Sequence, residues 1–266
     1  DLEVAQCKGG LCTDATVAEA GGGDSGTDAP PNDCPGTKGP PGVRVTAGAN
    51  SFCIDSTEVT FGQYREFVEA KLGDTSGQPA ECAFNTSYAV PAIGGDDEPV
   101  TNISWCDAVA YCKWAGKKLC GRIGSGVLSE REVSVPAVSQ WLYACSGGGK
   151  QNFPYGADFD ATKCNVLTDA GTKPVKSNAG CQGSVPGIYD LVGNVWEWID
   201  SECVPNDGGI DASKDATPGQ YDLCNARGAS YANPGTGTAD KLNCNSNARA
   251  PRSAKFNDVG FRCCSP

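Results

Sequence analysis

The sequence predicts an α+β domain with much irregular structure, and three observations lead to this fold class. Three segments have the periodicity of amphipathic helices, and short strand-like segments accompany them. Long loops rich in glycine, asparagine and aspartate connect these elements. Sixteen cysteines, an even number among 266 residues, can form up to eight disulfides. Disulfides of this number can staple a loop-rich chain in an oxidising compartment.

Residues 1–42 are predicted to be a tail or linker. They are poor in large apolar side chains and rich in glycine, aspartate, alanine, proline and threonine, so they cannot bury a core. Cys7 and Cys12 flank the sequence KGGL, whose two glycines allow a tight turn and a small disulfide loop. A metal knuckle is the alternative, but these two thiols have no further ligands beside them.

The composition of this tail does not allow it to order itself. We therefore expect either disulfides that tie it to the domain or a neighbouring copy of the chain that receives it as an arm. An arm of this kind would make the protein self-associate into a homo-oligomer or a filament.

The folded domain is predicted to span residues 43–266. Its first segment, VRVTAGANSFCID, alternates like a strand, and TEVTFGQYREFVEAKLG follows as an amphipathic helix. Thr60 and Gln63 form a capping box at the start of this helix, and Gly73 ends it. The apolar face of the helix consists of Phe61, Tyr64, Phe67 and Val68.

Two further helices are predicted. The second begins at Ser104, with Asp107 three residues later, and stops at Gly116; its inward residues are Trp105, Ala108, Cys112 and Ala115. The third runs through PAVSQWLYACSGG, with Pro136 in its first turn and Gly147 as its stop.

The composition excludes several classes of chemistry. The chain has no histidine and no methionine. Without histidine there is no Ser-His-Asp or Cys-His nucleophile pair and no histidine-based zinc or iron site. The net charge of −11, with no run of lysine and arginine, argues against a nucleic-acid partner.

The location predicted from the sequence is secreted, extracellular or on the cell surface. No apolar stretch reaches the roughly 20 residues that span a bilayer, and no signal peptide is visible at Asp1, so we expect a mature, soluble chain without a membrane span. The high cysteine content is typical of an oxidising compartment.

Seven segments, taken in order, resemble the formylglycine-generating enzyme family, also called the sulfatase-modifying-factor domain. They are IDSTEVTFGQYREFV, EPVTNISWCDAVAYCKWAGKKL, VPAVSQWLYACSGG, FPYG, GIYDLVGNVWEW, RGASY and GFRC. The resemblance covers about Ser51 to Cys264. It implies a C-type-lectin-like fold with little secondary structure for its size and with the two ends of the domain close together.

The resemblance also implies two disulfides, Cys112 with Cys263 and Cys145 with Cys244. Twelve cysteines remain, and proximity in the sequence suggests pairing Cys164 with Cys181 and Cys203 with Cys224. The adjacent Cys263 and Cys264 should point to opposite sides of a strand and therefore need different partners.

The family's oxidase activity, as the resemblance implies, uses copper(I) on two cysteines in the segment after RGGSY. With molecular oxygen it converts a sulfatase cysteine to formylglycine. Here Asn233 stands at the first position, three residues beyond Ser230, and the second position falls near Thr238 or Ala239. Because soft copper(I) needs thiolates there, we expect neither copper nor oxidase activity. The family's iron-dependent sulfoxide synthases take histidine ligands, which this chain lacks.

The segment GIYDLVGNVWEW predicts a calcium site. Its two carboxylates bracket carbonyl-bearing residues at odd spacing, so one looping strand can direct several oxygens at a single hard cation. The resemblance places calcium on the same residues, which are Asp190, Leu191, Gly193, Val195 and Glu197. The alternative is a strand and turn that pack a tryptophan of WEW into the core and leave both carboxylates solvated. For a second calcium site near Asn165 and Val166, the acidic partner is not evident.

These observations favour a non-catalytic structural or binding subunit that is supported by structural calcium. One alternative is a copper-dependent oxidase whose thiolates have moved elsewhere in the chain. Another is a ligand-display or adhesion module with a protein or glycan ligand, because related domains present a variable surface near their C-terminal end. The asparagines between Asn225 and Asn257 fit adaptable recognition, and they fit ordinary turns equally well; they include Asn233, Asn243, Asn245 and Asn247.

Overall fold

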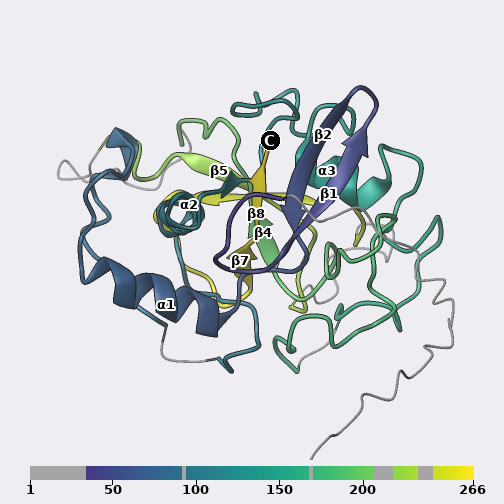
Figure 1. Cartoon of the computed structure of the whole chain (residues 1–266), viewed down its shortest axis with the longest axis horizontal. Helices are drawn as coiled ribbons and strands as arrows, with labels where there is room; N and C mark the ends of the chain where they lie inside the picture. Colours follow the sequence, from purple (N-terminus) through teal and green to yellow (C-terminus); the bar gives the residue numbers. More distant parts are fainter. Residues whose placement is uncertain (1–33, 92–93, 168–169, 207–217, 233–241) are drawn as a thin grey trace, which may run out of the picture. The chain divides into compact units, whose positions relative to one another are not determined.

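Two four-stranded sheets form the centre of the computed structural model, which describes residues 34–91, 94–167, 170–206, 218–232 and 242–266 (Figure 1). The first sheet has the order β1-β2-β8-β3 and the second the order β6-β5-β4-β7. Their bounds are β1 Gly42–Ala47, β2 Asn50–Asp55, β3 Lys118–Leu119, β4 Trp196–Trp198, β5 Leu223–Arg227, β6 Asn247–Pro251, β7 Val259–Phe261 and β8 Cys263–Ser265. The α+β fold class that the sequence predicts is confirmed.

The first sheet begins with an antiparallel hairpin of β1 and β2. Burial alternates along β1, where Val45 is buried, whereas β2 is buried on both faces from Phe52 to Asp55. β8 pairs with β2 on one side and β3 on the other, and Cys53 lies opposite Ser265. The end of the domain is therefore beside its start.

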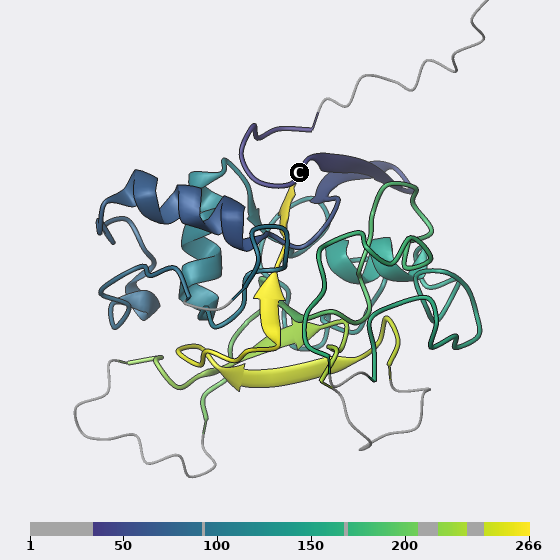
Figure 2. The same ribbon diagram turned by 90° about the horizontal axis from the view of Figure 1, so that it is seen from below.

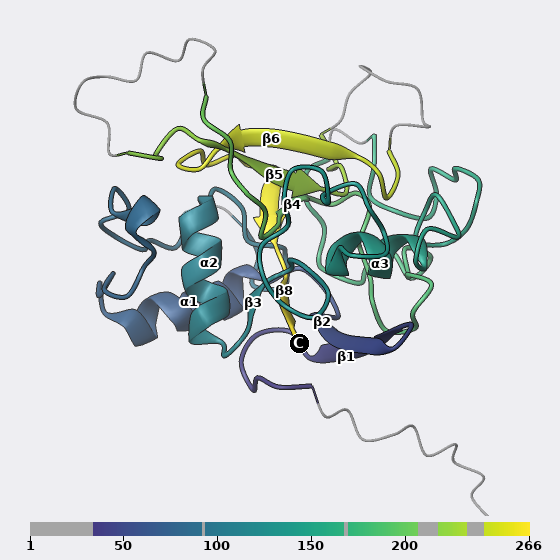
Figure 3. The ribbon, with the colours of Figure 1, turned by 90° about the horizontal axis from the view of Figure 1, so that it is seen from above.

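The second sheet is mixed, because β4 is antiparallel to β5 and parallel to β7. Only Arg262 separates β7 from β8, so the chain passes from the second sheet into the first within one residue. Figures 2 and 3 show α1 (Phe61–Lys71) and α2 (Trp105–Trp114) on one side of β8 and α3 (Gln140–Ser146) on the other.

The first two helices begin at the predicted residues. Thr60 caps α1 with Gln63, and Ser104 caps α2 with Asp107; both are complete capping boxes. The start of α3 differs from the prediction, since residues 136–138 lie outside the helix and Ser139 is its N-cap. The Ser139 hydroxyl accepts from the Leu142 amide, and this local bond sets the start of the helix. Gly147 ends it in the left-handed conformation, as predicted.

Two apolar clusters fill the domain. One lies beneath the β1–β2 hairpin and α3, around Trp141; the other lies around α1 and α2 and contains Trp198 and a group of aromatic rings in mostly tilted or edge-to-face contact. Trp196 packs against both clusters. None of the helices in the described ranges is long and apolar enough to cross a membrane.

Seven disulfides join the fourteen cysteines of the described residues. Cys112 is bonded to Cys263 and Cys145 to Cys244, the pairs that the family resemblance implies. Cys264 is bonded to Cys120, so the two adjacent cysteines of β8 have different partners. The remaining bonds are Cys34–Cys53, Cys82–Cys106, Cys164–Cys181 and Cys203–Cys224.

The start of the domain lies earlier in the chain than residue 43. From residue 34 onward the described residues belong to the compact unit that ends at Pro266, and the Cys34–Cys53 bond ties the first of them to β2. The Lys117 ammonium also donates to the Pro40 carbonyl. Composition does not reveal this, because one disulfide and one lysine hydrogen bond hold a segment that has no large apolar side chains. Residues 1–33, with Cys7 and Cys12, lie outside the described residues.

Candidate functional site

The predicted calcium residues lie on a tightly curled loop that leads into β4. Asp190, Gly193 and Asn194 all have positive φ values of 58°, 83° and 58°. A Cβ atom at Gly193 would lie 2.6 Å from the Asn165 carbonyl oxygen, so this position requires glycine. The loop therefore turns back on itself and brings the carboxylates of Asp190 and Glu197 to the interior, where they are 4% and 1% exposed.

Glu197 is the counter-ion of a buried arginine. Its two oxygens accept from Arg262 Nε and Nη2, each at 2.7 Å, and Oε2 also accepts from Trp141 Nε1 at 2.8 Å. Arg262 donates further to the backbone carbonyls of Asp55 and Tyr189. This bidentate pair sits at the junction of the two sheets and joins them to α3. The alternative in which Glu197 is solvated is wrong.

Two more carboxylates face the same interior. Asp190 accepts from the Lys176 amide at 2.7 Å, and burial raises its pKa to about 6. Glu58 Oε1 accepts from Asn194 Nδ2, while Oε2 has no partner among the described residues. The pKa of Glu58 is well above its usual range because of burial and then the nearby Asp190 carboxylate. Sequence reasoning missed Glu58, because it lies in the polar stretch DSTEVT, where a charged side chain gives no signal of burial.

The charges and hydrogen bonds of this cluster determine which oxygens could bind calcium. Glu58, Asp190 and Glu197 face a single guanidinium, that of Arg262, so the ionised cluster carries an excess of negative charge that a divalent cation would offset. Few oxygen ligands are left for a metal, because hydrogen bonds from Arg262 and Trp141 occupy most of the lone pairs of Glu197. Among the described residues, no group of three or more carboxylates or cysteines lies close enough to hold a metal. Calcium would therefore depend on the carbonyls of Leu191, Gly193 and Val195 together with Asp190.

Asn165, near the second calcium position, has a structural role. Its Nδ2 donates to the Gly171 carbonyl and to Asn194 Oδ1, and its carbonyl accepts from the Asn194 amide. The side chain thus fastens its own loop to the curled loop before β4.

The segment in which the family's oxidases hold copper follows a serine that is buried and hydrogen-bonded here. Ser230 Oγ donates to Asp258 at 2.9 Å and accepts from the Ala232 amide. The positions where copper thiolates are expected, Asn233 and Thr238 or Ala239, lie outside the described residues. Cys244, the next cysteine in the chain, is bonded to Cys145 and offers no thiolate.

The asparagines considered for ligand display make internal contacts. Asn225 is 1% exposed and bonds to Ser201 and Asn247. Asn243 accepts from the Asn245 amide within a turn. Asn225 and Asn243 therefore have structural roles, whereas Asn245, Asn247 and Asn257 are exposed.

Comparisons with known proteins agree with this architecture. Residues 6–265 match the family described as sulfatase-modifying factor enzyme 1-like domain. The chain is 30% identical over 292 residues to the inactive C-alpha-formylglycine-generating enzyme 2 of Bos taurus, covering 90% of this chain and 84% of that protein.

Two solved structures show the same C-type-lectin-like fold. PvdO from Pseudomonas aeruginosa has a TM-score of 0.52 at 22% identity, and the match covers 81% of this chain and 80% of PvdO. CarF has a TM-score of 0.51 at 20% identity over 88% of this chain and 96% of CarF. With a family match over nearly its whole length, the chain belongs to the formylglycine-generating enzyme family, the sulfatase-modifying-factor proteins.

Proposed function

We propose that this protein is a non-catalytic member of its family that serves as a disulfide-stapled binding scaffold in an oxidising, extracellular setting. The observation that carries the proposal is the state of its cysteines. All fourteen described cysteines are in disulfides, so none of them can supply a copper thiolate. The similarity to an inactive relative supports the same conclusion.

Counting free thiols tests this proposal. The unreduced protein is denatured and treated with an alkylating reagent, and the labelled cysteines are identified by mass spectrometry. We expect no labelled cysteine, because Cys7 and Cys12 should also pair. Labelling of both Cys7 and Cys12 would instead favour the alternative function, a copper-dependent oxidase whose thiolates lie elsewhere in the chain.

We further propose that calcium binds at the curled loop, through the Asp190 carboxylate and the carbonyls of Leu191, Gly193 and Val195, with Glu197 next to it. The excess negative charge of the buried cluster supports this, since calcium would offset it without displacing Arg262. Its role would be structural.

We also propose that residues 1–33 act as an arm for self-association, on the grounds of their composition.

A further inference from the structure

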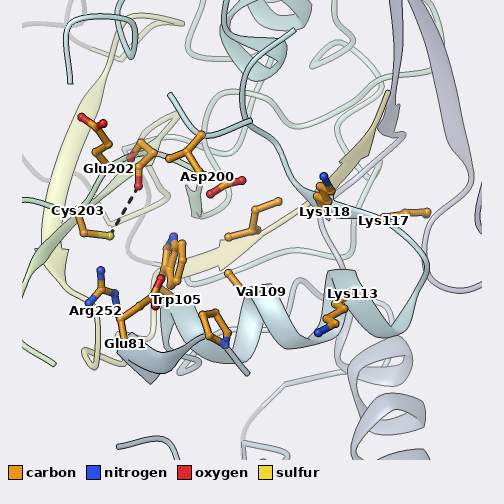
Figure 4. A pocket seen from close by; sticks show the side chains of 14 residues that line it. Glu81, Trp105, Val109, Lys113, Lys117, Lys118, Asp200, Glu202, Cys203 and Arg252 are labelled. Atoms are coloured by element: carbon orange, nitrogen blue, oxygen red, sulfur yellow. Dashed lines mark hydrogen bonds between the residues drawn. The ribbon is translucent and has the colours of Figure 1, made fainter. Parts of the chain in front are cut away.

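A pocket of about 500 Å³ opens between α2, β3 and the segment after β4 (Figure 4). Its walls are largely apolar, with Trp105 and Val109 from α2 and Leu119 from β3; Pro79 and Val127 complete them. The volume lies within the range of pockets that bind small ligands or anchor side chains, roughly 300 to 1,000 Å³. No residue of the calcium loop lines it.

Asp200 places a carboxylate in the lining of this pocket. Its side chain is partly buried, and Figure 4 shows its carboxylate directed into the space between Trp105 and Lys118. The carboxylate has no hydrogen bond or ion pair with any described residue. Burial raises its pKa, whereas Lys118 lowers it and Glu81 raises it further. A cation placed beside Asp200 would thus be favoured by the electrostatics of the site.

Most cations of the lining are already paired. The Lys117 ammonium binds Asp55 at 2.6 Å, and the Lys113 ammonium donates to the Gly77 carbonyl at 2.8 Å. Arg252 is held by Asp222 and the Gly219 carbonyl. Lys118 is the one lining cation without such a partner among the described residues.

Three carboxylates of the lining face two lysines, Lys113 and Lys118, whose charge no described carboxylate pairs with. Glu81 and Glu202, both exposed, stand at the rim and add to the charge of Asp200. None of the three carboxylates has an ion pair in the described part of the chain. The pocket therefore combines apolar walls with a small excess of negative charge.

Two features indicate the shape of the occupant. The Arg252 guanidinium lies 5.5 Å from the Trp105 ring centre, so this indole already packs against one cation. At the rim, Val127 is 49% exposed, and a partner that fills the pocket would cover it. A side chain on a protein surface suits this shape, because it can fill the pocket while the residues around it cover the rim.

We propose that the pocket receives an arginine or lysine side chain from a partner protein. The aliphatic stem lies against Trp105, Val109 and Leu119, and the cation meets Asp200. This inference rests on the proposed scaffold function and specifies its partner surface as one with an exposed basic anchor.

The test uses N-acetyl-arginine methylamide as the probe and the isosteric but neutral N-acetyl-citrulline methylamide as its control. Binding is followed by the NMR shift of the Trp105 indole N–H at low salt. We expect saturable binding of the arginine probe and binding of the citrulline probe that is about 10-fold or more weaker, the ratio typical of a charge-assisted hydrogen bond. Equal binding of the two probes, or no saturable binding of either, would overturn the proposal.

Two variants that are expected to change the affinity for the arginine probe in opposite directions separate an effect on binding from an effect on folding. Asp200→Asn should weaken binding of the arginine probe about 10-fold, while Lys118→Gln should strengthen it because the competing cation is removed. Glu69→Gln and Lys150→Gln change the same charges at exposed positions outside the pocket and should leave binding unchanged. A change of the same size in the control variants would refute the role of Asp200. The thiol count does not depend on this pocket, so loss of the pocket proposal would leave the scaffold proposal intact.

Discussion

Arg262 is the residue on which the two sheets depend. It is fully buried, and all four of the contacts described above hold it in place between β7 and β8. Breaking a buried pair of this kind leaves an uncompensated charge and costs about 3 to 5 kcal/mol. Glu197→Gln should therefore destabilise the protein by that amount with or without calcium, and it cannot serve as a test of metal binding.

Asp190→Asn is the cleaner test of calcium. Asparagine tolerates the left-handed backbone of this position, and the substitution leaves the Glu197–Arg262 pair intact. In the wild type, free calcium at 100 times its Kd should raise the melting temperature by about 5 to 10 °C relative to excess chelator. Asp190→Asn should lose most of this difference, as measured by calorimetry. Identical wild-type melting temperatures in calcium and chelator would remove the site.

The buried carboxyls predict an unusual pH dependence in chelator. The pKa of Asp55 and that of Asp190 are each raised to about 6, mainly by burial. Between pH 4 and 6 these groups bind more protons in the folded chain than in the unfolded chain, so their contribution to stability falls as the pH rises. We expect the melting temperature in chelator to increase as the pH is lowered from 7 to 5.

Calcium should reverse part of this trend, because protons compete with the metal for Asp190. The stabilisation by calcium should shrink over the same interval. A melting temperature in chelator that falls steadily from pH 7 to pH 5 would contradict the raised pKa values.

At the scale of elements, β8 is held by two disulfides that close nearly the same loop. Cys112–Cys263 spans 151 residues and Cys120–Cys264 spans 144. Removing one leaves the other to hold the ends together, so only a short nested loop is released. In the chain-entropy model this costs on the order of 2 to 3 kcal/mol, whereas removing both also releases the outer loop, at roughly 4 kcal/mol more, because Cys145–Cys244 already shortens that loop.

The two cysteine pairs should therefore show non-additive effects. Replacing Cys112 and Cys263 with alanine, or Cys120 and Cys264, should lower the free energy of unfolding less than half as much as replacing all four. Urea unfolding of the three variants measures this. Simple additivity would mean that the bonds act through local packing instead of loop closure.

The elements differ in how far the sequence predicts them. α1 and α2 could be placed because their capping boxes are local, and each needs only residues three apart. The strands β3, β4, β7 and β8 have two or three residues each, too few for alternation to be visible, and their partners are distant in the chain. The start of α3 was misplaced because proline at a first turn and serine at an N-cap are both valid helix starts, and Ser139 makes the bond.

The candidate site was predicted in part. Its backbone segment could be recognised from GIYDLVGNVWEW, and the two disulfides from the family resemblance. Glu58 and Arg262 could not be assigned, because a buried ion pair depends on which distant segments meet. The pocket beside Asp200 is likewise a product of tertiary packing, since its lining residues lie from Pro79 to Arg252.

At the scale of the whole molecule, self-association through the N-terminal arm can be tested by truncation. The deletion should stop at residue 31, because Cys34 is needed for its bond to Cys53. We expect the full-length chain to show a mass above that of a monomer by light scattering and the truncated chain to be monomeric. Cys7→Ser with Cys12→Ser serves as a control for intermolecular disulfides. A monomeric full-length chain at high concentration would exclude the arm.

The central claim, that this member of the family is not an oxidase, is tested most directly by assaying turnover. The purified chain is incubated with copper(I), oxygen, a thiol reductant and a cysteine-containing sulfatase peptide, with an active formylglycine-generating enzyme as the positive control. Mass spectrometry of the peptide reports conversion of cysteine to formylglycine. We expect none from the wild type, and none from Asn233→Cys, since the second thiolate position near Thr238 or Ala239 still lacks cysteine. Copper-dependent formation of formylglycine by the wild-type chain would contradict the account.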